Sequence, residues 1–177
     1  MRSLIITFCT TFFFGLAQGA IPATSAPESN HYADYDRDFK IVLPEKWQVQ
    51  RQFMGLDIFA AAPSENEQLG SRANISVISA DIDEPVTLDQ YVNQNLENLK
   101  KSLADFKMIE TGKLYFDGTE ARRLVYTHKV HDLEIRVAQY FVLNDKRGFV
   151  ITCSAASDVY PKYAEAFDQT IKTFKIF

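Results

Sequence analysis

The chain has 177 residues, 19 of them Lys or Arg and 23 Asp or Glu, which gives a formal net charge of −4. This mildly acidic, interspersed pattern lacks the clustered cations that bind nucleic acid or anionic lipid, so we expect neither as a partner. The length fits one domain with a single core that needs neither a disulfide nor a structural metal.

Residues 1–19 have the features of a cleavable secretory signal. Arg2 gives a positive start, Leu4–Leu16 an apolar stretch, and Ala17 and Gly19 the small residues that precede a cleavage site. The apolar stretch is shorter than the ~20 residues of a membrane-spanning helix, so no transmembrane segment is expected after cleavage. We therefore expect a periplasmic or secreted protein that begins at Ala20.

Residues 20–37 are rich in Pro, Ala, Ser and Asn and have no apolar period, which is typical of a flexible leader. The folded domain is expected over residues 38–177. Cleavage would leave Cys153 as the one cysteine, and it alternates with Phe149 and Ile151 along an expected strand. That position favours a small buried side chain over a reactive or intermolecular thiol.

The first half of the domain predicts four strands followed by a helix. Alternation of apolar residues and the closing prolines place the strands at Phe39–Leu43, Trp47–Phe53, Leu56–Ala62 and Ala73–Ala80. The period then changes to three and four residues, which predicts a helix over 88–103. Thr87 and Gln90 fit a capping box at its start.

The second half predicts a meander of strands and a closing helix. Strand character at Met108–Ile109 and Leu114–Phe116 leads to a hairpin turn at Asp117-Gly118. Two long strands, 120–130 and 133–143, turn at His131-Asp132, which sets Tyr126 opposite Val137 and Lys129 opposite Glu134. One face then holds Leu124, Tyr126, Val130, Leu133, Ile135 and Val137. The last strand is Phe149–Ala155, and the helix Val159–Thr173 turns Tyr163, Phe167, Ile171 and Phe174 inward.

This element order predicts the α+β class. Hairpin connections imply a mainly antiparallel sheet, and two long amphipathic helices each need a sheet face to cover. The expected architecture is an α/β/α sandwich.

Phe39-Lys40-Ile41-Val42-Leu43-Pro44 followed by Trp47 resembles the opening of the PsbP-like and DcrB-like superfamily, the Mog/PsbP/DcrB fold group. Further matches follow in order and extend to residue 174: Ala73–Val77, Thr87-Leu88, Gly118–Tyr126, Gly148, Ile151–Ala155, Tyr163 with Phe167, and Thr173-Phe174. The resemblance implies the same sandwich. It also implies a protein that binds, as photosystem subunits, assembly factors, toxin chaperones and Ran-binding members do, and it brings no catalytic residues.

Four residues at the start of the domain are candidate ligands of a divalent cation: His31, Asp34, Asp36 and Asp38. Carboxylates and an imidazole suit such an ion, but the spacing lacks the glycine and distal glutamate of a calcium loop. Solvated charge on a mobile tail is the favoured interpretation, so no cofactor is expected and a divalent cation is the alternative.

Two further sets of side chains are candidates for a protein interface. Arg122, Arg123 and Arg136 lie on paired strands and would form a basic patch for an acidic partner, or an ordinary solvated face. The aromatic candidates are Trp47, Tyr115 and Phe116, of which Trp47 is expected to pack in the core.

The chain has no G-x-S-x-G, Walker, G-x-G-x-x-G, H-E-x-x-H or C-x-x-C motif, so we do not expect an enzyme. The leading hypothesis is an exported, non-enzymatic binding or accessory factor with a protein partner in the cell envelope. The alternatives are a carrier of a small ligand or metal ion, and a hydrolase with an unrecognised site.

Overall fold

A computed structural model of the chain describes residues 30–63 and 72–177. The expected signal, 1–19, and residues 20–29 of the expected leader lie outside the described residues. The elements in chain order are β1 (His31–Asp34), β2 (Phe39–Val42), β3 (Gln48–Phe53), β4 (Leu56–Ala61), β5 (Asn74–Asp81), α1 (Leu88–Ser102), β6 (Ala104–Phe116), β7 (Thr119–Val130), β8 (Leu133–Asn144), β9 (Arg147–Ala156), α2 (Tyr160–Lys172) and β10 (Lys175–Ile176).

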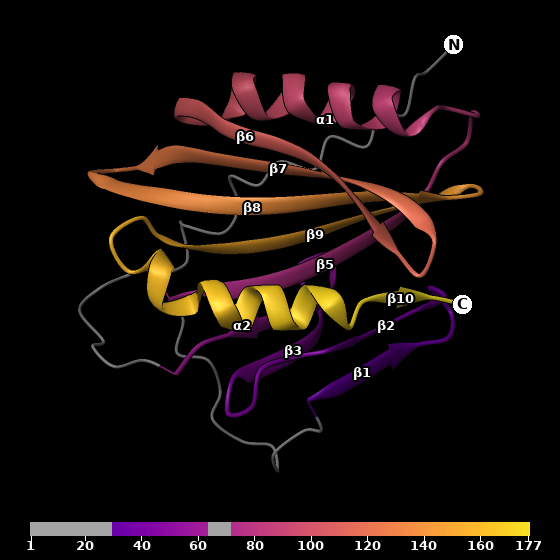
Figure 1. Cartoon of the computed structure of the whole chain (residues 1–177), viewed down its shortest axis with the longest axis horizontal. Helices are drawn as coiled ribbons and strands as arrows, with labels where there is room; N and C mark the ends of the chain where they lie inside the picture. The colour runs from indigo at the N-terminus through magenta and orange to yellow at the C-terminus, as the bar shows by residue number, and fades with distance from the viewer. Residues whose placement is uncertain (1–29, 64–71) are drawn as a thin grey trace.

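Ten described strands form two antiparallel sheets (Figure 1). The large sheet has seven strands in the order β3-β4-β5-β9-β8-β7-β6, and the small sheet has the order β1-β2-β10. The α+β class with a large, mainly antiparallel sheet is confirmed. The fold is dominated by its strands, since α1 has 15 residues and α2 has 13. Within the described residues, no helix is long and apolar enough to cross a membrane.

The central strands β7, β8 and β9 are apolar on both faces of the sheet. One face carries Val125 and Ala138 and belongs to a core cluster that includes residues of β2 and α2. The other carries Leu124 and Tyr126 and packs against residues of α1. Successive side chains of a strand point to opposite faces, so each face requires its own cover. Residues of α2 and β2 supply one cover, and residues of α1 supply the other.

The expected β7–β8 register is confirmed. Tyr126 pairs with Val137 and Lys129 with Glu134, on either side of the turn at 131–132. All six residues predicted to share a face lie in or against the cluster beneath α1. Burial and charge pairing therefore select the same register.

An aromatic cluster joins the small sheet to α2 and the large sheet. The Phe39 ring of β2 lies 5.8 Å from that of Phe174 and 5.9 Å from that of Phe149, measured between centroids. Phe116, at the end of β6, lies edge-on to Phe174 with centroids 5.3 Å apart. Phe174, near the C-terminal end of the chain, therefore packs in the same core as Phe39 of β2.

One local feature fixes the start of α1, and another lets the helix pack closely on the sheet. The predicted capping box is present, because the Gln90 backbone N–H donates to Thr87 Oγ1 and the Thr87 N–H donates to Gln90 Oε1. Gly148 on β9 leaves room for the Tyr91 ring, since a methyl group at position 148 would lie 2.7 Å from Tyr91 Cζ. The ring of Tyr91 also lies edge-on to that of Phe141.

Part of the predicted leader, 20–37, is strand. Residues His31–Asp34 form β1 and pair with β2. Tyr32 anchors this strand, because it is 5% exposed and its ring packs on that of Phe39. A single buried aromatic residue in a polar segment produces no apolar period, so the sequence pattern did not predict this strand.

The structure differs from the sequence prediction in two further places. The short strands expected at Met108–Ile109 and Leu114–Phe116 are one strand, β6, which starts two residues after α1 and contains two register shifts. The two-residue strand β10 was not expected after α2. It pairs with β2 and is too short to show a sequence period.

We predict that Gly148→Ala lowers the free energy of unfolding by about 1–3 kcal/mol, because the added methyl group displaces the Tyr91 ring. Urea unfolding measures the change. The matched control is Gly112→Ala, whose methyl group would lie at an ordinary 4.0 Å from Arg123 Cβ. A Tyr91→Ala background should remove most of the loss, and an equal loss in both backgrounds would contradict this packing.

Candidate functional site

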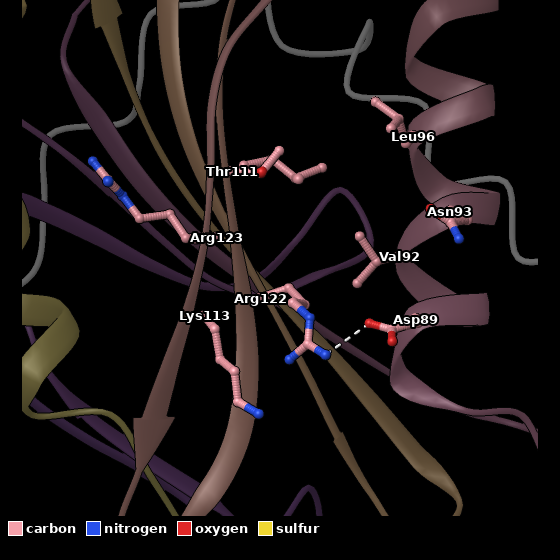
Figure 2. Close-up of a pocket in the computed structure, with 10 residues that line it drawn as sticks. Asp89, Val92, Asn93, Leu96, Thr111, Lys113, Arg122 and Arg123 are labelled. Carbon is pink, nitrogen blue, oxygen red and sulfur yellow. Dashed lines mark ion pairs between the residues drawn. The ribbon is translucent and has the colours of Figure 1, made fainter.

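A groove lies between α1 and strands β6 and β7, with a volume of about 550 Å³. Figure 2 shows α1 side chains on one side of it and the two strands on the other. The lining residues are Asp89, Val92, Asn93, Leu96, Thr111, Gly112, Lys113, Arg122, Arg123 and Leu124. They combine apolar and charged groups, as a surface that recognises another molecule requires.

The connection between α1 and β6 sets the position of the groove. Because β6 begins only two residues after α1 ends, helix and strand are held together at that end. The groove lies along the first half of α1, between Asp89 and Leu96, away from that junction. It faces the middle of β6, at Thr111–Lys113.

One row of laterally paired residues runs across the sheet from β5 to β6. Its residues are apolar on β5, β9 and β8 and positively charged on β7 and β6. Ile78, Val150 and Phe141 are its apolar members on β5, β9 and β8. The row then continues to Arg122 on β7 and Lys113 on β6. The two cations therefore stand at the margin of the core beneath α1.

Four charged side chains form a chain of ion pairs across the groove. Arg122 Nη2 lies 2.8 Å from Asp89 Oδ1, and Arg122 Nη1 pairs with Glu120 Oε1. Lys113 Nζ lies 3.0 Å from the same Glu120 oxygen. Hydrogen bonds from Arg122 and Lys113 lower the pKa of Glu120. The Arg122 side chain is 22% exposed, whereas that of Lys113 is 51% exposed. Exposed pairs cost little to separate, so an incoming polar group can exchange with the Lys113–Glu120 pair.

The structure does not bring the three candidate arginines onto one face. Arg122 lies in the groove, where Figure 2 shows its guanidinium directed at Asp89 and that of Arg123 directed away from α1. Arg123 pairs with Glu110 at 3.1 Å, and the Arg136 guanidinium lies 5.1 Å from the centre of the Tyr160 ring. Residues 122 and 123 are neighbours on one strand, so their side chains point to opposite faces.

The candidate cation ligands are His31, Asp34, Asp36 and Asp38. Asp34 closes the β1–β2 turn: its Oδ2 accepts a hydrogen bond from the Tyr32 hydroxyl at 2.7 Å, and its Oδ1 accepts the Arg37 N–H at 3.0 Å. Asp38 Oδ2 lies 3.0 Å from Arg147 Nη1. Over residues 30–63 and 72–177, no group of three or more His, Cys, Asp or Glu side chains could hold a metal ion.

Asp57 is a buried carboxylate that was not among the residues predicted from the sequence. Its Oδ2 accepts the Ser79 N–H at 2.6 Å, and its Oδ1 lies 3.9 Å from Arg37 Nε. Burial raises the pKa of Asp57. The available signal was an acidic residue inside the otherwise apolar run Leu56–Ala62. This carboxylate ties β4 to β5 and does not reach the groove.

The aromatic candidates divide between core and surface. Trp47 packs edge-on against Tyr163 and Phe167, in line with the expected core role, and Phe116 is buried in the aromatic cluster. Tyr115 is 59% exposed and lies on β6, beside the groove residue Lys113.

Cys153 is fully buried, as predicted. Burial raises the pKa of its thiol. The reactive species of cysteine is the thiolate, so a raised pKa together with burial makes this thiol inert.

A protein-family model described as DcrB matches residues 39–173. The chain belongs to the DcrB family. The match spans the elements from β2 to the end of α2, and therefore includes both sides of the groove. A comparison with curated protein sequences gave no match.

Solved structures share the fold of this DcrB-family chain. PsbP from the cyanobacterium Synechocystis sp. PCC 6803 (CyanoP) is 16% identical, with a TM-score of 0.61 over 90% of this chain and 99% of that one. LpqN of Mycobacterium tuberculosis, described as involved in cell envelope biogenesis, is 15% identical, with a TM-score of 0.64 over 78% and 82%. PA94 of Pseudomonas aeruginosa, a protein of unknown function, is 18% identical, with a TM-score of 0.59 over 81% and 93%.

We predict that Cys153 does not react with a thiol reagent at pH 8 in the folded protein and reacts fully in denaturant. The Tyr115→Cys variant, with its exposed position on β6, should react within minutes under native conditions. The Cys153→Ala variant shows which part of the labelling comes from Cys153. Rapid native labelling that disappears in Cys153→Ala would show that this core opens.

Proposed function

We propose that this chain is an exported binding or accessory protein of the cell envelope, without catalytic activity of its own, whose protein partner docks in the groove beside α1. The observation that carries the proposal is the groove itself. It combines the apolar side chains of Val92, Leu96 and Leu124 with a rim of exchangeable ion pairs. None of the residues that line it is His, Ser or Cys.

The family and the comparisons support this class of function. The chain belongs to the DcrB family, and one structural relative is described as involved in cell envelope biogenesis. The expected signal at residues 1–19 supports the same location. We regard the layers as an α/β/α sandwich, in which the core is filled by side chains and binding falls to rims and edges of the sheet.

A carrier of a small amphipathic ligand is the second candidate. The volume of about 550 Å³ lies within the ~300–1,000 Å³ typical of ligand pockets. Native mass spectrometry of the protein purified from its host distinguishes the two functions. A carrier retains a bound small molecule that denaturation releases, whereas a docking surface retains none.

Asn93 and Gln94 provide a matched pair for testing the groove. Both are exposed neighbours on α1, but only Asn93 lines the groove. A photo-cross-linking amino acid at position 93 should give a defined protein adduct in host cells, and the same group at position 94 should not. Adducts of equal yield at both positions would place the partner elsewhere.

We predict that Asn93→Arg weakens binding of the cross-linked partner about tenfold, equivalent to ~1.4 kcal/mol, because a long charged side chain enters the groove. Gln94→Arg should leave the affinity unchanged. Titration by isothermal calorimetry measures both. Equal affinities for the two variants would rule out docking beside Val92 and Leu96.

A further inference from the structure

The face of the large sheet on which α1 lies is only partly covered by that helix. α1 packs on β6, β7 and β8, and the strands β9, β5, β4 and β3 continue the same face beside it. Ile78 of β5 and Val150 of β9 still belong to the apolar cluster beneath α1. Farther along these two strands, away from that pair, the face becomes polar.

Laterally paired residues form a polar strip on this part of the face. Residues paired across a ladder share a face of the sheet. Gln139 pairs with Leu124, which lies beneath α1, so the row through Gln139 is on the α1 face. That row continues to β3, and Asn74 and Ser154 pair in the next row. The strip consists of Gln50, Asn74, Ser76, Gln139, Thr152 and Ser154.

The polar strip differs from an ordinary solvent-facing side of an antiparallel sheet, which carries exposed polar residues. Ser76 is 6% exposed, Ser154 7% and Gln139 3%. None of the six residues of the strip is charged. Gln139 Nε2 donates a hydrogen bond to Thr152 Oγ1 at 3.1 Å, and Ser154 Oγ donates to Asn74 Oδ1 at 3.0 Å. The strip is therefore a buried surface of neutral hydrogen-bonding groups.

Two buried amide atoms beside these groups, Asn98 Nδ2 and Gln50 Oε1, have no hydrogen-bond partner among the described residues. Gln50 belongs to the strip itself. Tyr91, Asn95 and Asn98 follow one another at four and three residues, which places them on one stripe of α1. Because Tyr91 contacts Gly148 of β9, this stripe lies toward β9.

The direction of α1 brings Asn98 to the polar strip. The end of α1 leads into Ala104, which pairs with Lys129, and Lys129 pairs with Glu134, whose carbonyl accepts a hydrogen bond at the end of β9. Helix and strand therefore run in the same direction. The seven residues from the Tyr91 contact to Asn98 span about 10 Å, which is about three residues of β9. Asn98 thus lies at the level where the strip begins.

We propose that the polar strip, together with Asn98, binds a neutral sugar. A buried donor and a buried acceptor without partners cost free energy, and a ligand that pairs with both removes that cost. An ionic ligand would find no counter-charge in the strip, and an apolar ligand would leave the amides unpaired. Amide and hydroxyl side chains both donate and accept, as sugar hydroxyls do.

Phe59 adds an apolar surface to this site. It lies between Gln50 and Ser76 in the same row, so its ring is on the same face. A sugar ring has a nonpolar face as well as polar edges, and it can pack on an aromatic ring while its hydroxyls reach the amides. The site lies on the flank of α1 opposite to Asn93 and the groove, and the inference does not depend on the proposed function.

The stability of the free protein tests the unpaired amides without any ligand. Asn98→Leu and Gln50→Leu should raise the urea midpoint, because each removes a buried polar atom that has no partner. Asn93→Leu is the matched control for position 98, since Asn93 is exposed on the other flank of the same helix. A rise for Asn98→Leu no larger than that for Asn93→Leu would overturn the proposal.

Sugar binding is tested by nuclear magnetic resonance of the ¹⁵N-labelled protein, titrated with glucose, maltose, cellobiose and N-acetylglucosamine. At least one of these sugars should shift the side-chain amide resonances of Asn98, Gln50 and Gln139 and leave that of Asn93 in place. Asn98→Ala and Gln50→Ala should each weaken binding about fivefold, as expected for the loss of one hydrogen bond. Asn93→Ala should leave it unchanged.

The absence of a shift at these amides with every sugar of the panel would overturn the proposal, as would equal weakening by Asn93→Ala and Asn98→Ala. A response of the same amides to decanoate or to an unstructured peptide, without a response to sugars, would assign the strip to another class of ligand and would also count against it. Asn93→Arg should leave sugar binding intact, which separates this result from the groove.

Discussion

The arrangement of the molecule depends on one constraint, the apolar character of both faces of β7, β8 and β9. Adjacent residues such as Leu124 and Val125 are both buried, although their side chains point in opposite directions. Such a sheet is stable only when both faces are covered. The small sheet and α2 cover one face, and α1 covers part of the other. The core takes up both faces of these strands, and the groove lies at the margin of the sheet.

The groove follows from the short connection between α1 and β6. Starting two residues after the helix, β6 is placed at the margin of the sheet beside α1. The same strand therefore supplies Thr111 and Lys113 to the groove. The groove uses the flank of α1 that carries Asn93, and the proposed sugar site uses the opposite flank, which carries Asn98.

Much of the fold could be predicted from the sequence where several local signals agree. In α1, the capping box and the apolar period define the same helix, and in β7–β8 burial and charge pairing select one register. β1 could not be predicted, because its attachment depends on one aromatic residue, Tyr32, packing against a distant strand. The groove was also missed. Arg122 was a candidate, but its partner Asp89 belongs to another element, and a sequence does not show how far apart two elements lie. Arg122 and Arg123 both line the groove, but their side chains point in different directions because neighbouring residues of a strand alternate between its faces.

The small sheet unites the two ends of the described domain, since β2 pairs with β10 and the Phe39 ring packs on that of Phe174. A ribosome delivers residue 39 long before residue 174, so during most of synthesis β2 has β1 and Tyr32 beside it but lacks β10 and the rings of Phe149 and Phe174. Contacts between residues so far apart in sequence are slow to form. The small sheet and the aromatic cluster are therefore complete only when the last residues of the chain have been made.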